Sequence, residues 1–599
     1  MAKGKEGDWE RRALDWLGRN WKLVTLLCWL GFCGWMVYSN WDRIRWFALG
    51  DTDDNMRIMQ VRAWLHGQGW YDLRNYRMNP PYGANIHWSR LVDLPIAGLI
   101  LVLRPFLGGA GAERWACAIA PMIPYLLLLY SLALTARRLL GPSAYLLAFL
   151  ALFFAGSNNG MFTPERIDHH GWQLALLALS VSSIADPKRI RGGLVLGIST
   201  ALSLAIGLEM IIYLALAGVA MVLFWVEDAE ERERLAAYAV SLGGGTAFCF
   251  LVFASNDNWF AVCDALSPVW LSDALIGSAL MLALSWASPA GRKRRFALAL
   301  GAGVVIAAFH GLTWPRCLSR PEGVSPEVER LWLSHVKEAR PFYMHGWRIA
   351  TLILALPVTG AIGWAVLARW RRNDPELRRR VIGAAIPGIA ATLLLFWQTR
   401  TGPAAQMMAV IGAAALIWIV LPRFWGSKNA LGVVLGSFLI VMIGGGMMVP
   451  IVVGFIPEEK PSKRDIAIGK ANNLCGTLWG LHNVALQPRG RVITFVDLGP
   501  RLITVTHHDT VSGPYHRNGQ QIADTMNFWR GSADQAHGIA RKYRANYVLS
   551  CPNSSTTTIF EAEAPKGFYV QLTRGDVPSW LTPVMLSKDS PYRMWKVIG

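Results

Sequence analysis

The sequence lacks the motifs of a soluble nucleotide-binding or zinc-binding protein. Its 599 residues contain no GxGxxG or P-loop stretch, and its eight cysteines show no zinc-site spacing. Acidic residues are scarce, with 40 Asp and Glu against 59 Lys and Arg, so the net charge is +19. No small-residue cleavage site follows the first apolar run, so we expect that run to remain as a membrane anchor.

Hydrophobic residues are abundant instead. They make up 53% of the chain, 28 residues are tryptophan, and the mean hydropathy is +0.30, which is too apolar for a soluble protein of this size. Many apolar runs are long enough to cross a bilayer core of about 30 Å. We therefore expect a membrane domain at 1–456 and a water-exposed domain at 457–599. The basic excess fits cytoplasmic loops, so we expect no nucleic-acid partner.

The apolar runs predict a polytopic α-helical membrane protein with about 13 spans. The stretch Leu94–Leu107 holds Pro95, Arg104 and Pro105, and we interpret it as a helix at the membrane surface. The expected spans are 23–39, 113–135, 143–157, 171–186, 193–208, 210–226, 236–253, 269–287, 296–311, 347–369, 381–398, 404–421 and 430–455.

The distribution of positive charge predicts the orientation of these spans. With 94–107 at the surface, every strongly basic loop falls on one side, which should be cytoplasmic. These loops hold Lys3, Lys5, Arg11 and Arg12; Arg137 and Arg138; Lys188, Arg189 and Arg191; Arg292–Arg295; and Arg369 through Arg380. We expect an inner membrane of a bacterium, with a cytoplasmic N-terminus and four periplasmic pieces at 40–93, 157–170, 312–346 and 457–599.

The cysteines divide into two groups along this topology. Four lie in expected spans, where a free cysteine behaves as a small apolar residue. The other four lie on the oxidising side, which favours disulfides. We expect Cys475 to pair with Cys551, since they are the only two in the C-terminal domain, and Cys263 to pair with Cys317.

Acidic residues gather in three outer loops. Asp51, Asp53 and Asp54 follow the first span, Asp168 and His170 follow the third, and Glu338 lies in the loop 312–346. Carboxylates suit Mg²⁺ or Mn²⁺, so the pattern suggests a metal-assisted active site at the lipid–water boundary rather than a pore. Each group also has a purely structural explanation. Asp168 could be the N-cap of a helix, the first group could lie in a solvent-exposed loop where acids are common, and Glu338 could belong to a charged surface helix.

Further polar residues are candidates for substrate contacts. Arg400 follows a span and faces outward, where it binds a lipid phosphate or extends to a headgroup. In the C-terminal domain, alternating strands and helices predict an α/β fold. Its polar, turn-rich stretch includes Asp497, His507, His508 and His516, which are candidates for acceptor binding or for structural turns.

These motifs and their order resemble those of the GT-C membrane glycosyltransferases, above all the catalytic subunit of oligosaccharyltransferases. Gly50–Asp53 resembles the family's first-loop GxxD pattern and points to Asp53, whereas Asp54–Arg57 resembles the corresponding motif of lipid-sugar transferases and points to Asp54. Asp168–His170 resembles the second-loop metal motif. His335–Pro341 resembles the stretch with the family's glutamate, here Glu338, and Gln398–Arg400 resembles the motif whose arginine contacts the donor phosphate.

One departure from this family concerns the acceptor. The WWDYG motif, which reads the glycosylation sequon, is absent, and Phe495–Gly499 stands in roughly its place without the tryptophan pair. The acceptor expected from this difference is a glycan, a lipid or another molecule of the cell envelope.

The resemblance implies an inverting glycosyltransferase that uses a polyprenyl-phosphate or polyprenyl-pyrophosphate sugar. Asp53 or Asp54 would be the general base, and Asp53, Asp168, His170 and Glu338 would hold a divalent cation. The alternatives are a protein oligosaccharyltransferase with atypical acceptor recognition, a transporter or flippase of lipid-linked sugars, and a non-catalytic assembly protein. The sequence shows no internal repeat of the transporter kind, and its acids lie outside the spans, with Glu209 the nearest exception.

Overall fold

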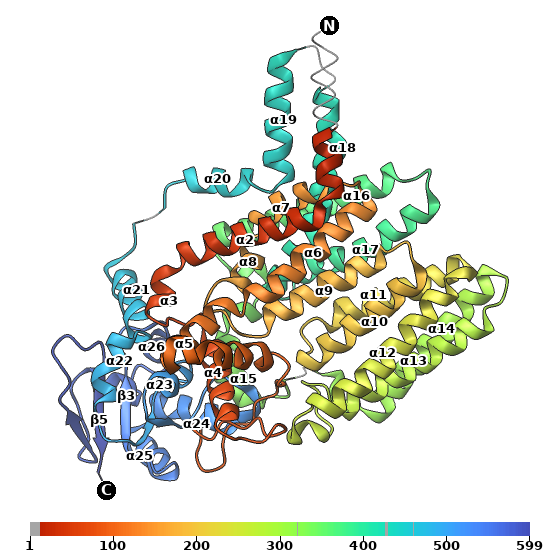
Figure 1. The fold of residues 1–599 in the computed structure, drawn as a ribbon. Coiled ribbons are helices and arrows are strands. Elements are labelled where there is room, and N and C mark those ends of the chain that lie inside the picture. Colours follow the sequence, from red (N-terminus) through yellow and green to blue (C-terminus); the bar gives the residue numbers. More distant parts are fainter. Residues whose placement is uncertain (1–11, 320–321, 426–428, 459, 599) are drawn as a thin grey trace.

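The protein is a helical bundle that carries a small α/β domain at one end (Figure 1). This computed structural model describes residues 12–319, 322–425, 429–458 and 460–598. Lys3, Lys5 and Arg11, which belong to the expected cytoplasmic N-terminus, lie outside the described residues. The fold class expected from the sequence, a polytopic helical membrane protein with a C-terminal α/β domain, is confirmed.

The N-terminal domain is almost entirely helical. Its helices are α2 (Trp21–Ser39), α3 (Trp41–Arg45), α4 (Thr52–Leu65), α5 (Asp93–Ile119), α6 (Met122–Leu139), α7 (Tyr145–Phe153), α8 (Gly156–Asn159), α9 (His170–Ile184), α10 (Arg189–Ile206), α11 (Ile211–Glu227), α12 (Arg232–Phe253), α13 (Pro268–Ala287), α14 (Arg292–Thr313), α15 (Pro326–Leu331), α16 (Trp347–Trp370), α17 (Pro375–Leu394), α18 (Gly402–Trp425), α19 (Ala430–Gly444) and α20 (Met448–Phe455).

Local sequence explains where several of these helices begin. Asp374 accepts a hydrogen bond from the backbone N–H of Leu377 and is followed by Pro375 at the first position of α17. Ser267 caps α13 in the same way and is followed by Pro268. A capping oxygen followed by proline is favourable because the first turn has free N–H groups and needs no donor at its first residue.

The number of spans remains a prediction. Within the described residues, eight helices are long and apolar enough to cross a membrane, or up to ten if each of two bent pairs is one span. Helices α9, α11 and α17 match three further expected spans, but α9 has 15 residues, α11 has 17, and α17 carries three arginines near its start.

Three expected spans have different boundaries in the structure. The span 113–135 is divided between α5 and α6, because Pro121 lacks the N–H needed to continue α5, and 94–107 forms the first part of α5 before a break at Gly108. The span 143–157 bends by 81° between α7 and α8. The span 430–455 bends by 88° between α19 and α20, where Gly446 has a φ of 73° that favours glycine.

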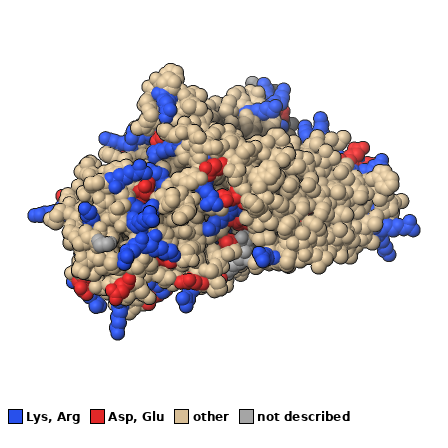
Figure 2. All heavy atoms as spheres, turned by 90° about the horizontal axis from the view of Figure 1, so that it is seen from below, with Lys and Arg blue, Asp and Glu red and all other residues tan. Residues whose placement is uncertain are grey.

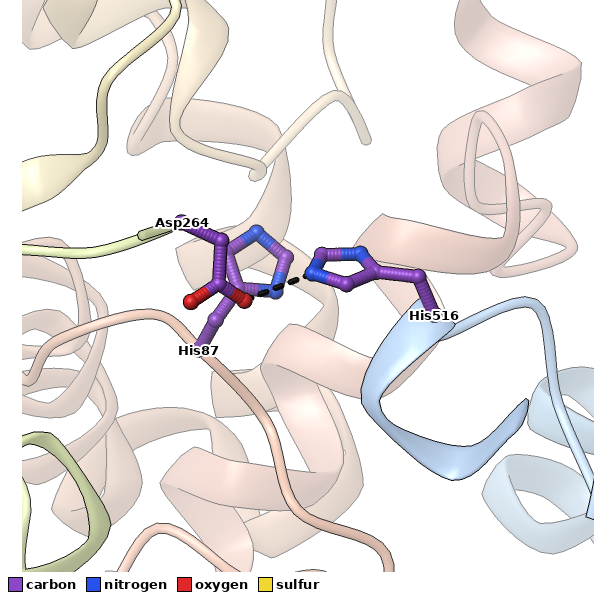
Figure 3. A group of neighbouring side chains, drawn as sticks. All are labelled: His87, Asp264 and His516. Atoms are coloured by element: carbon purple, nitrogen blue, oxygen red, sulfur yellow. Dashed lines mark hydrogen bonds and ion pairs between the residues drawn. The ribbon is translucent and has the colours of Figure 1, made fainter. Parts of the chain in front are cut away.

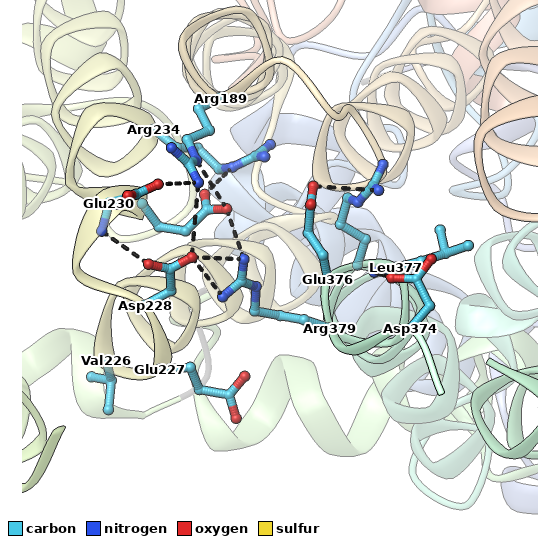
Figure 4. Close-up of polar contacts among 12 residues, drawn as sticks. Arg189, Val226, Glu227, Asp228, Glu230, Arg234, Asp374, Glu376, Leu377 and Arg379 are labelled. Carbon is cyan, nitrogen blue, oxygen red and sulfur yellow. Dashed lines mark hydrogen bonds and ion pairs between the residues drawn. The ribbon is translucent and has the colours of Figure 1, made fainter. Parts of the chain in front are cut away.

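The basic loops expected on the cytoplasmic side meet at one end of the bundle (Figure 4). Arg189, at the start of α10, lies 2.8 Å from Glu230, and Arg379, at the start of α17, lies 3.1 Å from Glu231. Arg138, at the end of α6, lies 2.6 Å from Asp186. The whole length of α9, about 22 Å for 15 residues, separates this end from the acids that precede α9. Basic loops and acidic loops therefore lie at opposite ends, as the charge pattern predicts.

The C-terminal domain contains a five-stranded sheet of order β2-β1-β3-β5-β4. Strand β1 pairs in parallel with β2 and β3, and β5 pairs antiparallel with β3 and β4. Its strands are β1 (Arg491–Ile493), β2 (Asp509–Thr510), β3 (Tyr547–Ser550), β4 (Leu581–Val584) and β5 (Arg593–Val597). Its helices are α21 (Lys463–Cys475), α22 (Leu478–Ala485), α23 (Gly499–Val505), α24 (Gly519–Arg530), α25 (Ala533–Lys542), α26 (Ser555–Glu563) and α27 (Phe568–Thr573).

Both expected disulfides are confirmed. Cys475 and Cys551 lie with their Cα atoms 6.3 Å apart and join α21 to the end of β3. Cys263 and Cys317, with Cα atoms 5.3 Å apart, join the loops that follow α12 and α14. The remaining four cysteines are free, as expected.

The C-terminal domain packs directly on α4, the helix that begins with the acids (Figure 1). In α23, Thr504 donates a hydrogen bond of 3.1 Å to the carbonyl of Asn55, and Arg501 donates one of 3.3 Å to the Asn55 side chain. The Tyr515 hydroxyl donates to the carbonyl of Thr52 at 2.9 Å. The C-terminal domain therefore forms one wall beside the acidic cluster.

Candidate active site

The acidic cluster begins with the N-terminal cap of α4. Asp51 is the cap residue, and its carboxylate accepts hydrogen bonds from the N–H groups of Asp53 (2.8 Å) and Asp54 (3.3 Å). The Asp54 carboxylate accepts in return from the N–H of Asp51 at 2.9 Å, which completes a capping box. Two of the three acids are therefore held in fixed positions by the backbone of α4.

The loop 157–170 adds its own polar residues to this helix start. The N–H of Asp168 donates to the second oxygen of Asp54 at 2.9 Å. Arg166 forms ion pairs with Asp51, with Asp54 at 3.6 Å and with Asp168 at 2.9 Å. The two outer loops therefore share one charge cluster, as the sequence predicts.

Asp168 also organises the start of α9. Its carboxylate accepts from the N–H of His170 at 2.9 Å and lies 3.1 Å from Nδ1 of the same ring. The cap residue of α9 is His169, so Asp168 is not the N-cap of the structural alternative, although it accepts from the first N–H of the helix and is part of the cluster. Burial alone would raise the pKa of Asp168, but the positive charges of Arg166 and His170 outweigh it and hold that pKa well below its usual range.

Asp53 differs from its two neighbours. Its side chain makes no hydrogen bond or ion pair with any residue that the structure describes, whereas both oxygens of Asp54 are used and Asp54 is fully buried. Burial, together with the charges of Asp51 and Asp168, raises the pKa of Asp53 to about 8. Asp53 is therefore the acid of this cluster whose oxygens are free for a ligand, a proton or a substrate.

The cluster has the chemistry to hold a divalent cation. Asp51, Asp54 and Asp168 each offer an oxygen within 4.8 Å of the other two. Oδ2 of Asp168 is buried, and its partner among the described residues is Nε of Arg166 at 2.9 Å. Oxygen donors of this kind fit Mg²⁺ or Mn²⁺, and a cation would also lower the unfavourably raised pKa of Asp53.

Neighbouring residues that the sequence did not single out complete the site. Arg166 lies only two positions before Asp168, and this closeness in the sequence could have indicated that it belongs to the site. Glu209 lies 2.7 Å from Nε2 of His169. Its charge, near the outer surface, was the feature of the sequence that could have indicated its place in the site. Trp88 packs on the rings of His169 and Tyr515, with centroids 5.4 Å and 5.8 Å apart. Nothing local in the sequence indicated the position of Trp88.

Glu338 lies beside Arg400 rather than beside the acids. Its carboxylate is 3.8 Å from the Arg400 guanidinium, and its side chain is 65% exposed. A second acid, Glu322, lies 3.6 Å from the same guanidinium. No hydrogen bond or ion pair between described residues links Glu338 to Asp53, Asp168 or His170, so its role as a metal ligand stays a prediction.

The four candidates in the C-terminal domain have different surroundings. His508 is completely buried, and its two ring nitrogens face the carbonyl of Val484 and the N–H of Gly490. The ring holds two backbone segments together, and acceptor binding by His508 stays a prediction that its burial does not support. Asp497 and His507 are exposed. His516 contacts Asp264, a residue of the N-terminal domain, at 2.6 Å.

Comparison with solved structures identifies the fold. The chain matches the oligosaccharyltransferase AglB of Archaeoglobus fulgidus, solved with an inhibitory peptide and a dolichol-phosphate, with a TM-score of 0.65 at 16% identity over 96% of this chain and 74% of AglB. The protein has the GT-C fold. A structure of the same archaeal enzyme tethered to an acceptor peptide with an NVT sequon matches with a TM-score of 0.63 at 17% identity, over 92% of this chain and 72% of that one.

A third structure of this GT-C enzyme, a complex with Zn and sulfate, matches with a TM-score of 0.56 at 16% identity over 84% of this chain and 64% of that one. No protein-family model matches the sequence, and no curated protein matches it. At these identities the likeness concerns the GT-C fold alone. It confirms the expected fold family, and the chain is an integral membrane protein by its apolar helices.

Proposed function

We propose that this protein transfers a sugar or oligosaccharide from a polyprenyl-phosphate or polyprenyl-pyrophosphate donor to an acceptor of the cell envelope. The observation that carries the proposal is the free carboxylate of Asp53, held within a fixed cluster of acids where the bundle meets the C-terminal domain. A donor of this class keeps its tail in the bilayer and its sugar in water. Its enzyme therefore needs polar chemistry at such a boundary.

Asp53 is the residue to which we assign the role of general base. The acceptor hydroxyl or amide attacks the anomeric carbon of the sugar, the bond from that carbon to the donor phosphate breaks, and the electron pair leaves with the phosphate. The acceptor proton goes to the carboxylate of Asp53. The pKa of about 8 belongs to the cluster without a cation, and a bound cation would lower it and keep Asp53 ionised to accept the proton. Attack opposite the leaving phosphate inverts the anomeric centre.

A divalent cation would be held by Asp168 with Asp51 and Asp54, next to Asp53 and His170. When bound, it supplies positive charge for the leaving phosphate. The role of Arg166 differs from that of the cation. Its guanidinium neutralises the same carboxylates and keeps Asp168 ionised. We assign Arg400 to the donor phosphate, and in that case Glu322 and Glu338 give up their contacts with its guanidinium when the donor binds.

The acceptor pocket differs from one built on a tryptophan pair. Phe495 and Val496 occupy the corresponding stretch, and both are buried in the core of the C-terminal domain, whereas Asp497 is exposed. No flat aromatic platform therefore stands at this place. This difference supports a glycan or lipid acceptor over a peptide, and it leaves Asp497 and His507 as the candidate acceptor contacts.

The charge pattern supports the side on which the reaction takes place. The basic end of the bundle faces the cytoplasm if the positive-inside rule holds, and the acids and the C-terminal domain then face outward. Two disulfides on that outer side agree with an oxidising compartment. We place the enzyme in an inner membrane of a bacterium, with its site on the periplasmic face.

The test is mass spectrometry of envelope glycans and lipid-linked sugars in cells that carry the wild type, a deletion, or Asp53→Asn. Loss of a sugar from one glycan, with the lipid-linked donor accumulating in both mutants, identifies donor and acceptor together. Asp534→Asn, a change of a carboxylate remote from the cluster, is the matched control and should behave as wild type. If Asp53→Asn fully restores the deletion strain, Asp53 is not the base, and the transporter or assembly interpretations take precedence.

A further inference from the structure

A second group of metal-ligating side chains lies outside the acidic cluster. His87, Asp264 and His516 each offer one ligand atom, and these atoms lie within 4.8 Å of one another (Figure 3). They come from the loop before α5, the loop before α13 and the C-terminal domain. Three segments that are far apart in sequence therefore meet at one point.

The ligand geometry is largely built in advance. Nε2 of His516 lies 2.6 Å from the Asp264 carboxylate, and the rings of His87 and His516 lie with centroids 4.7 Å apart. Nδ1 of His87 is buried without a hydrogen-bond partner among the described residues. An imidazole nitrogen in that position, beside a second imidazole and a carboxylate, lacks a partner that a metal ion would provide.

Neighbouring contacts hold the three segments in place. Arg517 makes two hydrogen bonds of 2.7 Å to Asp264 and one of 3.1 Å to Asn85. Asn518 makes two more to the backbone of Asn85, at 3.0 Å and 3.1 Å. Cys263, directly before Asp264, is fixed by its disulfide to Cys317. A carboxylate ligand that is also held by an arginine fits the usual outer-shell arrangement of metal sites.

The types of ligand atom in this group indicate which metal ion it would bind. Two imidazole nitrogens and one carboxylate oxygen form a common ligand set for Zn²⁺, with a fourth position left for water. Ligand atoms of a tetrahedral zinc lie about 3.3 Å apart, given bonds of about 2.0–2.1 Å. Nε2 of His516 and the Asp264 oxygen, which are 2.6 Å apart, therefore have to separate by about 0.7 Å as His516 exchanges its hydrogen bond to Asp264 for a bond to the metal.

The geometry points to a zinc site formed by His87, Asp264 and His516 that links the C-terminal domain to two outer loops of the membrane domain. It is separate from the oxygen-donor cluster but adjacent to it. Trp88, next to His87, and Tyr515, next to His516, pack on each other, and the Tyr515 hydroxyl donates to Thr52 at the start of α4. The zinc site thereby fixes the wall of the candidate active site, and it does not depend on which reaction occurs there.

The experiment uses the full chain in detergent, stripped with a chelator and then given Zn²⁺ in the presence of excess Mg²⁺ for the oxygen-donor cluster. Bound zinc is measured by equilibrium dialysis and elemental analysis, and the melting temperature by thermal scans. The variants are His87→Gln and His516→Gln. The matched controls are His482→Gln, an exposed histidine of the same domain, and Asp53→Asn, which alters the acidic cluster.

Wild type and both controls should bind one zinc and gain a few degrees of melting temperature with it, whereas both site variants should bind zinc at least about tenfold more weakly and gain none. His87→Gln is the decisive variant, because His87 makes no hydrogen bond with a described residue whose loss would disturb the fold. Equal zinc binding by wild type and His87→Gln overturns the proposal. Zinc lost only in Asp53→Asn overturns it too, since the ion then belongs to the acidic cluster.

Discussion

Removing the positive charge of Arg166 should destabilise the protein in a pH-dependent way. Arg166 is mostly buried, and two of its partners, Asp54 and Asp168, have side chains with no exposure. Arg166→Met therefore leaves buried carboxylates without their cation. Removing one member of a buried ion pair costs roughly 3–5 kcal/mol. The pair with the more exposed Asp51 adds little, because solvent screens it.

This cost converts to a shift that thermal scans can resolve. The entropy of unfolding is about 2.1 cal/mol/K per residue, or about 1.3 kcal/mol/K for this chain, so a cost of roughly 3–5 kcal/mol should lower the melting temperature by about 2–4 °C near pH 7.5. The matched control is Arg464→Met, which removes an exposed arginine from its pair with Glu561. A surface pair contributes about 0–1 kcal/mol, so this control should melt close to wild type.

The sign of the pH dependence follows from Asp168. In the wild type its pKa is held below the usual value, so it contributes stability at neutral pH that is lost as the pH falls through that depressed folded pKa. Without Arg166 the largest charge that opposes burial is lost, so the pKa of Asp168 rises and its ionised form contributes less stability at neutral pH. The deficit of Arg166→Met should therefore be largest near pH 7.5 and shrink toward pH 4.5.

A divalent cation provides a second test of the Arg166→Met variant. Mg²⁺ should raise the melting temperature of Arg166→Met more than that of wild type, because the ion replaces the missing positive charge. A melting temperature indistinguishable from that of wild type at pH 7.5, or a deficit that stays constant down to pH 4.5, would refute the reasoning.

Three further outcomes follow from the site. Asp53→Asn should lower transfer by about 10²–10⁴-fold without lowering the melting temperature, since the Asp53 side chain makes no hydrogen bond with a described residue. Asp54→Asn should lose stability because both Asp54 oxygens accept hydrogen bonds, one of them in the capping box, and equal melting of the two variants would contradict this assignment. Arg400→Gln should raise the KM for the lipid donor by about tenfold or more with little change in the KM for the acceptor, and Arg400→Lys should recover part of the loss in steady-state kinetics. His508→Ala should lower the melting temperature and leave the acceptor KM unchanged, and the reverse result would support His508 as an acceptor ligand.

Much of the site was accessible from the sequence because charge near a membrane is sparse and costly. Asp51, Asp53, Asp54 and Asp168 stood out for that reason, and the charge pattern placed them on one side before any fold was known. The sequence could not choose between Asp53 and Asp54. That choice depends on hydrogen bonds from Asp51 and from the N–H of Asp168, 114 residues beyond Asp54.

The sequence by itself determined the helical membrane fold, the α/β character of the C-terminal region, the pairing of four cysteines and the separation of basic from acidic loops. These features depend on the hydrophobicity and charge of neighbouring residues and on the side of the membrane on which a loop lies. They can therefore be recognised from short stretches of sequence. Only the tertiary structure decided that Arg166 joins the acids, that His508 is a buried brace, and that His87, Asp264 and His516 meet. Arg166 and Asp51 are 115 positions apart, His508 and Val484 are 24 apart, and Asp264 and His516 are 252 apart, and tertiary packing, not any local pattern, brings each pair together.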